Sequence, residues 1–440
     1  MEQKNSEETQ AFLYLQVYER YKELILSGQL RAGTRMPSLR KCSQEWKLSR
    51  TTIESAYLQL AAEGYILSRP QSGYFVTDIL SARKENVQSN SLHEEITWKY
   101  DLASSGVDRD SFRFDLWQRY IRSALRQDDR LLTYGEPQGE WDFREVLSEY
   151  VRTRRNILCS PEQIVVGAGV QNLLQILCPL LKNQRHTVSF PTPSFVQGST
   201  IFSDYDFQVH YRDKDSDVVY VSPAHMTAWG EIMSVKRRME LLSYAGSRGS
   251  LIIEDDYENE FVYLQKPTPS LYGLSKDQNV VYIGSFSRLL LPSIRISFMI
   301  LPEWLLEEYR KKAGCYNQTA SKAEQIALCQ FIRDGHLGAQ TRRLKRLYEK
   351  KEEAMIRCVR EIFGSGVSIR RGAAGTRLAV MLPSGKTQEE VLISARKEQC
   401  RLRILGEKDG MITFLLSCSS MDVAEFPEAL HTLKKILESR

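Results

Sequence analysis

The chain has 440 residues, of which 42% are hydrophobic and 26% charged, and its formal net charge is +5. This length is too great for one ordinary domain, and the composition is globular without a signature of disorder. The small excess of positive charge excludes a basic coat over the whole surface but not a local basic patch.

Membrane, disulfide and metal chemistry find no support in the sequence. No stretch approaches the length that crosses a bilayer, and the polar, acidic start MEQKNSEETQ is unlike a secretory signal. The eight cysteines are scattered without a Cys-x-x-Cys pair, and the six histidines do not cluster. We therefore expect no membrane partner, no disulfide framework, no metal site and a cytoplasmic location.

The first segment predicts three helices followed by a hairpin. Apolar residues at helical spacing precede Ser27-Gly28, Pro37 can open a second helix, and Ser49 is a good N-cap for a third that stops near Gly64. In YILSRPQSGYFV, two β-prone runs flank a turn at 69–73. The order is typical of a winged helix-turn-helix; the alternative is a small α+β core without a DNA role.

Charge and chemistry favour the DNA-binding interpretation. Between Arg20 and Val76 there are nine basic and four acidic residues, a net charge of +5. The third predicted helix begins Ser-Arg-Thr-Thr, so hydroxyls and a guanidinium stand at its N-terminus. Such groups contact phosphates and base edges when a helix enters the major groove.

The stretches LILSGQLRAGTRMPSLR, KLSRTTIESAYLQLAAEGYI and SRPQSGYFV resemble the GntR-type winged helix over residues 12–76. The resemblance implies double-stranded operator DNA as a partner. It places Arg40, Ser49, Arg50 and Thr51 where family members contact DNA, with Thr52 adjacent and Arg69 to Gly73 forming the wing. We predict a DNA-binding domain at 1–78 and a linker at 79–98, rich in Ser, Asn, Glu and Lys, which could also hold a short helix around Leu92 to Ile96.

The third predicted part, residues 99–440, alternates helical stretches with short apolar runs. These runs are QIVVGAG, HTVSF, VVYVS, SLIIEDD and NVVYIGSF. The alternation predicts an α/β domain with a mostly parallel sheet, in which ligands bind at the carboxyl ends of the strands.

The stretches YGEPQG, CSPEQIVVGAGVQNLL, IIEDDYENEFVY, GSFSRLLLPSIRISFMILP and YNQTASKAEQIAL resemble a fold-type I aminotransferase, in the form fused to GntR-type domains in MocR-type regulators. With the first segment, the resemblance covers nearly the whole chain. It implies a homodimer and a pocket of the kind that holds pyridoxal 5′-phosphate.

Residues that would suit this cofactor follow the apolar runs. Gly169-Val170-Gln171 opens a helix after a strand, where backbone N–H groups favour a phosphate. The resemblance assigns the ring cover to Phe195, the ring-nitrogen partner to Asp255, with Asp256 as the alternative, and the neighbour of the ring hydroxyl to Tyr257. It further assigns the phosphate contacts Ser285, Ser287 and Arg295, and keeps His225 in the pocket.

The lysine of the family pattern Gly-Thr/Ser-Phe-Ser-Lys is replaced here by Arg288. A guanidinium stays protonated and has no free lone pair to attack an aldehyde, so transamination by the usual route should be absent. Three interpretations of Arg288 follow. In the first, the pocket holds the cofactor or its amino-acid adduct non-covalently; in the second, it binds another anionic effector through Arg288. In the third, the domain is a dimerisation scaffold in which Arg288 pairs with Asp255 or Asp256.

Other positions also depart from the family pattern. Ala228-Trp229-Gly230 replaces a Pro-Thr/Ser-Gly turn, and no arginine can be assigned to a substrate carboxylate. No spacing argument makes Lys322 a substitute for the lost lysine. We therefore expect a DNA-binding regulator whose aminotransferase-like domain senses a small molecule; the alternative is an aminotransferase with an attached DNA-binding domain.

Overall fold

The structure is a computed structural model that describes residues 2–70, 72–78, 97–104, 106–108, 111–257, 259, 262, 268–275, 279–373, 376–419 and 421–438, with side chains from residue 13 onward. The chain divides into two compact units, Met1–Glu95 and Ile96–Arg440. The linker predicted at 79–98 and the alternative helix at 92–96 lie almost entirely outside the described residues.

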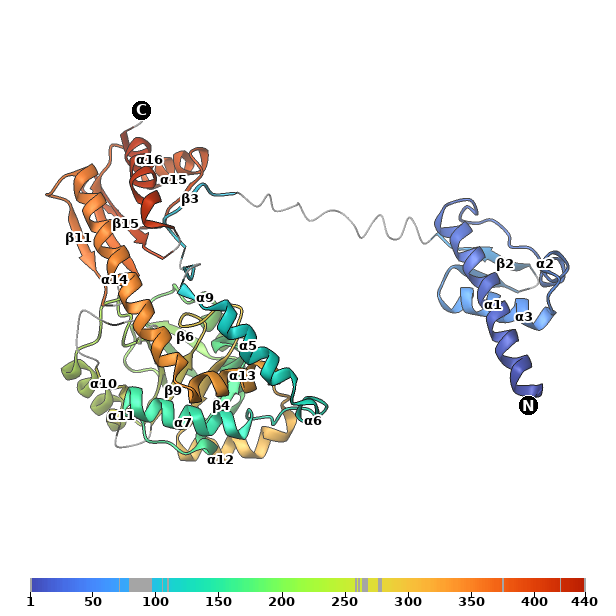
Figure 1. The fold of residues 1–440 in the computed structure, drawn as a ribbon, viewed down its shortest axis with the longest axis horizontal. Helices are drawn as coiled ribbons and strands as arrows, with labels where there is room; N and C mark the ends of the chain where they lie inside the picture. Colours follow the sequence, from blue (N-terminus) through green and yellow to red (C-terminus); the bar gives the residue numbers. More distant parts are fainter. Residues whose placement is uncertain are drawn as a thin grey trace. The chain divides into compact units, whose positions relative to one another are not determined.

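The first unit has three helices and a hairpin, as the sequence predicts (Figure 1). These are α1 (Glu2–Leu26), α2 (Leu39–Trp46), α3 (Arg50–Ala62), β1 (Ile66–Arg69) and β2 (Gly73–Val76). The Ser38 hydroxyl caps α2 by accepting the N–H of Lys41, and the Ser49 hydroxyl caps α3 by accepting the N–H of Thr52 (3.1 Å). The unit has its own core, which includes Val17, Ile53, Tyr57, Leu60 and Ile66.

The second unit contains a seven-stranded sheet in the order β4-β10-β9-β8-β7-β5-β6. Its strands are β4 (Ile164–Gly167), β5 (Thr187–Phe190), β6 (Gln208–Tyr211), β7 (Val218–Val221), β8 (Leu251–Asp255), β9 (Val280–Ser285) and β10 (Ser297–Ile300). Only β10 runs antiparallel to its neighbours β4 and β9. The sheet is therefore mostly parallel, as predicted, although the sequence did not indicate β6 or β10.

Helices cover both faces of this sheet, and successive strand residues pack alternately against the two helix layers because they point to opposite sides. Ile164 and Val166 join the core beneath α5 (Phe114–Leu125), α7 (Trp141–Arg155) and α13 (Lys322–Arg333), while Val165 joins the core beneath α8 (Val170–Leu181), α9 (Val196–Asp204) and α12 (Glu303–Lys312). Helix α10 (Val235–Arg248) and the short helices α6 (Asp128–Leu131) and α11 (Leu271–Leu274) complete the layers.

The long helix α14 (His336–Phe363) leads into a second, four-stranded antiparallel sheet of order β11-β12-β15-β14, which the sequence did not predict (Figure 1). Its strands are β11 (Ser368–Arg371), β12 (Arg377–Pro383), β14 (Ile404–Lys408) and β15 (Met411–Ser417). Helices α14, α15 (Gln388–Lys397) and α16 (Phe426–Glu438) pack on one face of it. Nearby, β3 (Tyr100–Asp101) pairs with β13 (Cys400–Arg401).

None of the helices described here combines the length and the apolar character that crossing a membrane requires.

Candidate DNA-contact surface and cofactor site

The start of α3 presents polar side chains to solvent. Ser49, Arg50 and Thr51 are exposed, and so is Arg40 in the first turn of α2. Thr52 differs from these residues: its side chain is only 5% exposed, and its hydroxyl lies 2.7 Å from the Ser49 hydroxyl. Thr52 faces the core and shares the helix cap, so less of its side chain is accessible to DNA than at Ser49, Arg50 and Thr51, and its contact stays a prediction.

The wing brings a further arginine to this unit's basic surface. Arg69 pairs with Gly73 across the hairpin, and its guanidinium lies 4.7 Å from the centre of the Phe75 ring. Gly73 has φ +93°, and a Cβ there would sit 3.7 Å from Nε of Arg35. Arg35 forms an isolated antiparallel β-bridge with Phe75. The place of Arg35 beside the wing depends on that pairing, and the sequence by itself indicates only its charge.

The predicted cofactor residues of the second unit gather at one edge of the large sheet. Strands β4, β5, β7, β8 and β9 all end at this edge, and β10 begins there because it is antiparallel. In the register, Ser297 of β10 lies opposite both Gly167 of β4 and Ser285 of β9. Segments from distant parts of the chain are thereby placed around one site, as expected for an α/β sheet.

The phosphate-type corner of this site combines a helix start, a cation and hydroxyls. Gly169 is the N-cap of α8, with φ +93° and ψ 168°. A Cβ at this position would overlap the guanidinium of Arg295, so glycine is what allows the close approach. Ser285 and Ser297 are joined through their hydroxyls (3.0 Å), and the N–H of Ser287 donates to Ser285 Oγ (3.4 Å).

Val170 and Gln171 form the first turn of α8 and contribute differently. The Val170 side chain packs against the apolar core, whereas Gln171 is exposed. The N–H of Ala168, just before the helix, donates to Thr319 Oγ1 (3.1 Å), which itself lies 2.7 Å from Asn172 Oδ1. Thr319 is thus a contact of this corner that sequence reasoning did not identify.

The two adjacent aspartates have different surroundings. The hydroxyl of Tyr220 on β7 donates to Oδ2 of Asp255 (2.5 Å), while Oδ1 of Asp255 is buried without a hydrogen-bond partner among the described residues. Asp256 accepts from Arg155 Nε (2.6 Å) and from the Tyr282 hydroxyl (2.7 Å). Asp255 therefore has an oxygen available for a ligand, and Asp256 is engaged in an internal ion pair.

Burial raises the pKa of Asp255 to about 7, and the nearby charge of Asp256 acts in the same direction. The hydrogen bond from Tyr220 opposes this shift, because it stabilises the ionised carboxylate. A cationic ring nitrogen bound at Oδ1 would stabilise the same ionised form.

Aromatic residues line the site on two sides. The Phe195 ring lies 5.4 Å from the Tyr220 ring, centre to centre, and His225 stacks on Tyr257 with 4.2 Å between ring centres and 6° between planes. Tyr220 thus contacts both the carboxylate and the predicted ring cover. The sequence contained it only as an apolar position in the VVYVS run.

Arg288 lies in the turn just beyond the end of β9, partly exposed. Within the described part of the chain, the side-chain contacts of Asp255 and Asp256 come from Tyr220, Tyr282 and Arg155. The reading in which Arg288 pairs with one of these aspartates finds no support in these contacts.

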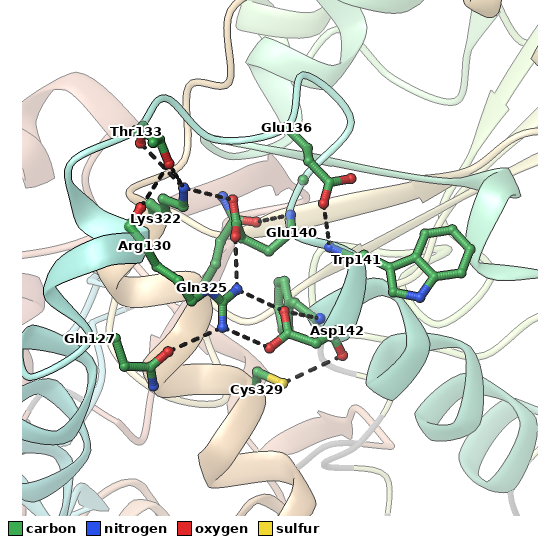
Figure 2. A network of polar contacts seen from close by, with 12 residues as sticks. Gln127, Arg130, Thr133, Glu136, Glu140, Trp141, Asp142, Lys322, Gln325 and Cys329 are labelled. Carbon is green, nitrogen blue, oxygen red and sulfur yellow. Dashed lines mark hydrogen bonds and ion pairs between the residues drawn. The ribbon is translucent and has the colours of Figure 1, made fainter.

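Lys322, which could be thought to substitute for the lysine replaced by Arg288, is held in a separate polar network (Figure 2). Its Nζ donates to the Thr133 hydroxyl (3.0 Å) and to the Tyr134 carbonyl (3.3 Å), and lies 3.8 Å from Glu140 Oε1. Glu140 and Asp142 are in turn bound by Arg130. Lys322 therefore supports the loop around Tyr134, and these contacts give no evidence for a covalent role.

The residues present fit pyridoxal 5′-phosphate, apart from the lysine. The close approach of Arg295 to Gly169 forms a cationic cradle suited to a phosphate, and the free oxygen of buried Asp255 suits a protonated ring nitrogen. When bound to an enzyme of this fold, the cofactor supplies an electron sink for amino-acid chemistry. Arg288, at the position where the family resemblance predicts the anchoring lysine, has no amine for covalent attachment.

Comparisons with known proteins agree with both units. Residues 13–76 match the model of bacterial regulatory proteins of the gntR family, and residues 99–362 match that of aminotransferase class I and II. The chain is 34% identical over 412 residues to the HTH-type transcriptional regulator YdeL of Bacillus subtilis, covering 89% of this chain and 88% of that relative. It is 26% identical over 419 residues to the regulatory protein MocR of Rhizobium meliloti, covering 88% and 85%.

Among solved structures, an archaeal alanine:glyoxylate aminotransferase has the same fold, with a TM-score of 0.68 at 18% identity over 82% of this chain and 94% of that one. The fold and the matched models define a winged-helix unit joined to an aminotransferase-type domain. The chain belongs to the MocR-type family of bacterial transcriptional regulators, in which a GntR winged helix precedes an aminotransferase class I and II domain.

Proposed function

We propose that this protein binds operator DNA through its winged helix and senses a small molecule in its aminotransferase-like domain without covalent attachment. The observation that carries the proposal is the combination of Arg288 at the lysine position with a phosphate-type corner and an available Asp255 oxygen. The ligand is a pyridoxal phosphate species or an amino-acid-like compound. Because the target is DNA in a bacterial cell, the place of action is the cytoplasm.

Regulation requires the ligand to favour one arrangement of the molecule over another. We infer a homodimer, in which effector binding changes the geometry between the two winged helices. In this proposal, Arg295, Ser285, Ser287 and the N-terminus of α8 hold the phosphate, Asp255 holds the ring nitrogen, and Phe195 covers the ring.

Covalent attachment is tested with pyridoxal phosphate, borohydride and peptide mass spectrometry. The parent protein should give no reduced lysine adduct, whereas Arg288→Lys should give one at residue 288, since it restores a primary amine at this position. The Lys322→Arg variant is the matched control for adventitious labelling. An adduct on any lysine in the parent that forms stoichiometrically would overturn the non-covalent proposal and favour the alternative, an aminotransferase with an attached DNA-binding domain.

DNA binding is tested with Arg50→Ala. Loss of one phosphate or base contact should weaken operator binding by about 1–3 kcal/mol and reduce the salt slope by about one if the contact is to a phosphate. Arg20, an exposed arginine on α1, provides the matched control Arg20→Ala. If Arg50→Ala binds like the parent across salt concentrations, the role assigned to Arg50 is wrong.

A further inference from the structure

The outer face of the small four-stranded sheet carries a cavity of about 520 Å³, away from the helices of that domain. The alternation of the strands explains its floor. Leu378, Val380 and Ile412 face the helix-covered core, so Ala379, Met381, Met411 and Thr413 face the other way and line the cavity. Its volume lies within the range of small-molecule sites.

One wall of this cavity is Trp229, which lies on the loop that follows β7 of the large domain. The loop is held against the β11–β12 connection, where the N–H of Ala373 donates to the Gly230 carbonyl (2.9 Å). A Cβ on Gly372 would overlap the Trp229 carbonyl, so glycine permits this contact. The departure from a Pro-Thr/Ser-Gly turn thus places an indole over the sheet.

Cations border the apolar floor. The Arg370 guanidinium of β11 lies 5.5 Å from the centre of a Trp229 ring, and Lys408 lies across the sheet at the end of β14. The indole N–H of Trp229 is buried and has no hydrogen-bond partner among the described residues. Glu407 and Asp409 also border the cavity, but Glu407 Oε2 accepts the N–H of Gln388 on α15 (3.2 Å).

We propose that this cavity binds an amphipathic carboxylate, with its apolar or aromatic body between Trp229 and the two methionines Met381 and Met411. The carboxylate would contact Arg370, since a guanidinium binds a carboxylate through parallel hydrogen bonds. Aromatic packing on the indole and methionine contacts supply the apolar part of the affinity. The proposal depends on neither DNA binding nor the cofactor-type site.

The test is calorimetry on the full chain with 3-phenylpropionate and its neutral isostere 3-phenylpropanamide. The acid should bind one site per chain and about tenfold more tightly than the amide, because only the acid makes charge-assisted hydrogen bonds. Arg370→Gln should reduce the affinity for the acid and leave that for the amide unchanged, whereas Lys408→Gln, on the opposite edge strand, should leave both unchanged. Met381→Ala should weaken both ligands.

Arg396→Gln changes an exposed arginine on α15, on the helix-covered side of this sheet, and is the matched control. The acid should also quench tryptophan fluorescence in the parent but not in Trp229→Phe. No saturable binding of the acid, the same affinity for the acid in Arg370→Gln as in the parent, or displacement of the acid by pyridoxal phosphate would overturn the proposal. The last outcome would place the acid in the site at the edge of the large sheet.

Discussion

Asp255 combines almost complete burial, one hydrogen bond from Tyr220 and a pKa of about 7. At neutral pH, a substantial fraction of the ligand-free protein therefore carries this carboxyl protonated. Ionising it in the folded state costs free energy that the unfolded chain, with the ordinary aspartate pKa, does not lose.

Asp255→Asn should make the stability less sensitive to pH. The pKa of Asp255 is higher in the folded protein than in the unfolded chain. Its contribution to the free energy of unfolding is therefore complete below the unfolded pKa and is lost as the pH rises through about 7. Between about pH 5 and pH 8 the parent should lose about 2–3 kcal/mol relative to the variant. Urea unfolding at both pH values measures this, and parallel pH profiles for the two proteins would contradict the assignment.

Tyr220→Phe should move this titration to higher pH, because the Tyr220 hydrogen bond lowers the pKa of Asp255. The variant should lose about 1 kcal/mol more at pH 8 than at pH 5, since the bond to an ionised oxygen is the stronger one. Tyr309→Phe is the control, because the buried hydroxyl of Tyr309 has no hydrogen-bond partner among the described residues. Its pH profile should match that of the parent.

At the scale of elements, the start of α8 depends on glycine for two separate reasons. Gly169 adopts φ +93° and ψ 168°, a region that other residues rarely adopt, and a Cβ there would also overlap Arg295. The helix N-terminus and the cation can approach one ligand only when both conditions are met.

Gly169→Ala should destabilise the domain and displace Arg295. Gly364, at the end of α14, has almost the same backbone angles (φ 97°, ψ 159°) and nothing within 4 Å of an added Cβ. Gly364→Ala therefore reports the backbone cost alone, about 1–3 kcal/mol, and Gly169→Ala should exceed it and also weaken binding of inorganic phosphate. Equal losses in unfolding experiments, with unchanged phosphate affinity, would show that Arg295 is not constrained by Gly169.

At the scale of the whole molecule, the positive charge of the first unit is concentrated in its winged helix. The residues between Arg20 and Val76 account for the net +5, and the rest of the chain has 51 basic and 51 acidic residues. Residues 1–19 and 77–95 cancel the excess of the winged helix, so the whole first unit has 12 basic and 12 acidic residues, and the second unit has 48 and 43. The positive charge expected to face DNA is therefore local to residues 20–76, and two winged helices would act together in the proposed dimer.

A fragment of residues 1–78 should fold on its own core and bind the operator at least about 10²-fold more weakly than the full chain, because it lacks the second, linked winged helix. Its salt slope should be about half as steep. Fluorescence anisotropy on a labelled operator measures both quantities, and circular dichroism checks that the fragment is folded. Equal affinity of fragment and full chain would contradict cooperation between two winged helices.

The sequence predicted those elements whose signals are local. The cap Ser49, the hairpin and the apolar strands β4, β5, β7, β8 and β9 agree with the structure, whereas the second helix is capped by Ser38 and begins after Pro37. The small sheet and the strands β6 and β10 were not predicted from the sequence. The DNA-contact and cofactor residues stay predictions, and Thr52 is the one among the predicted DNA contacts of α3 that is buried.

The chemistry of residue 288 follows from the sequence by itself, since an arginine has no free lone pair wherever the fold places it. The same holds for the family of the chain and for the net charge of +5 between Arg20 and Val76. Only the tertiary structure decided that Asp255 rather than Asp256 has an available oxygen, that Thr52 is buried and that Trp229 covers the small sheet. These outcomes depend on contacts between residues far apart in the chain, because burial and hydrogen bonding are properties of the packed molecule.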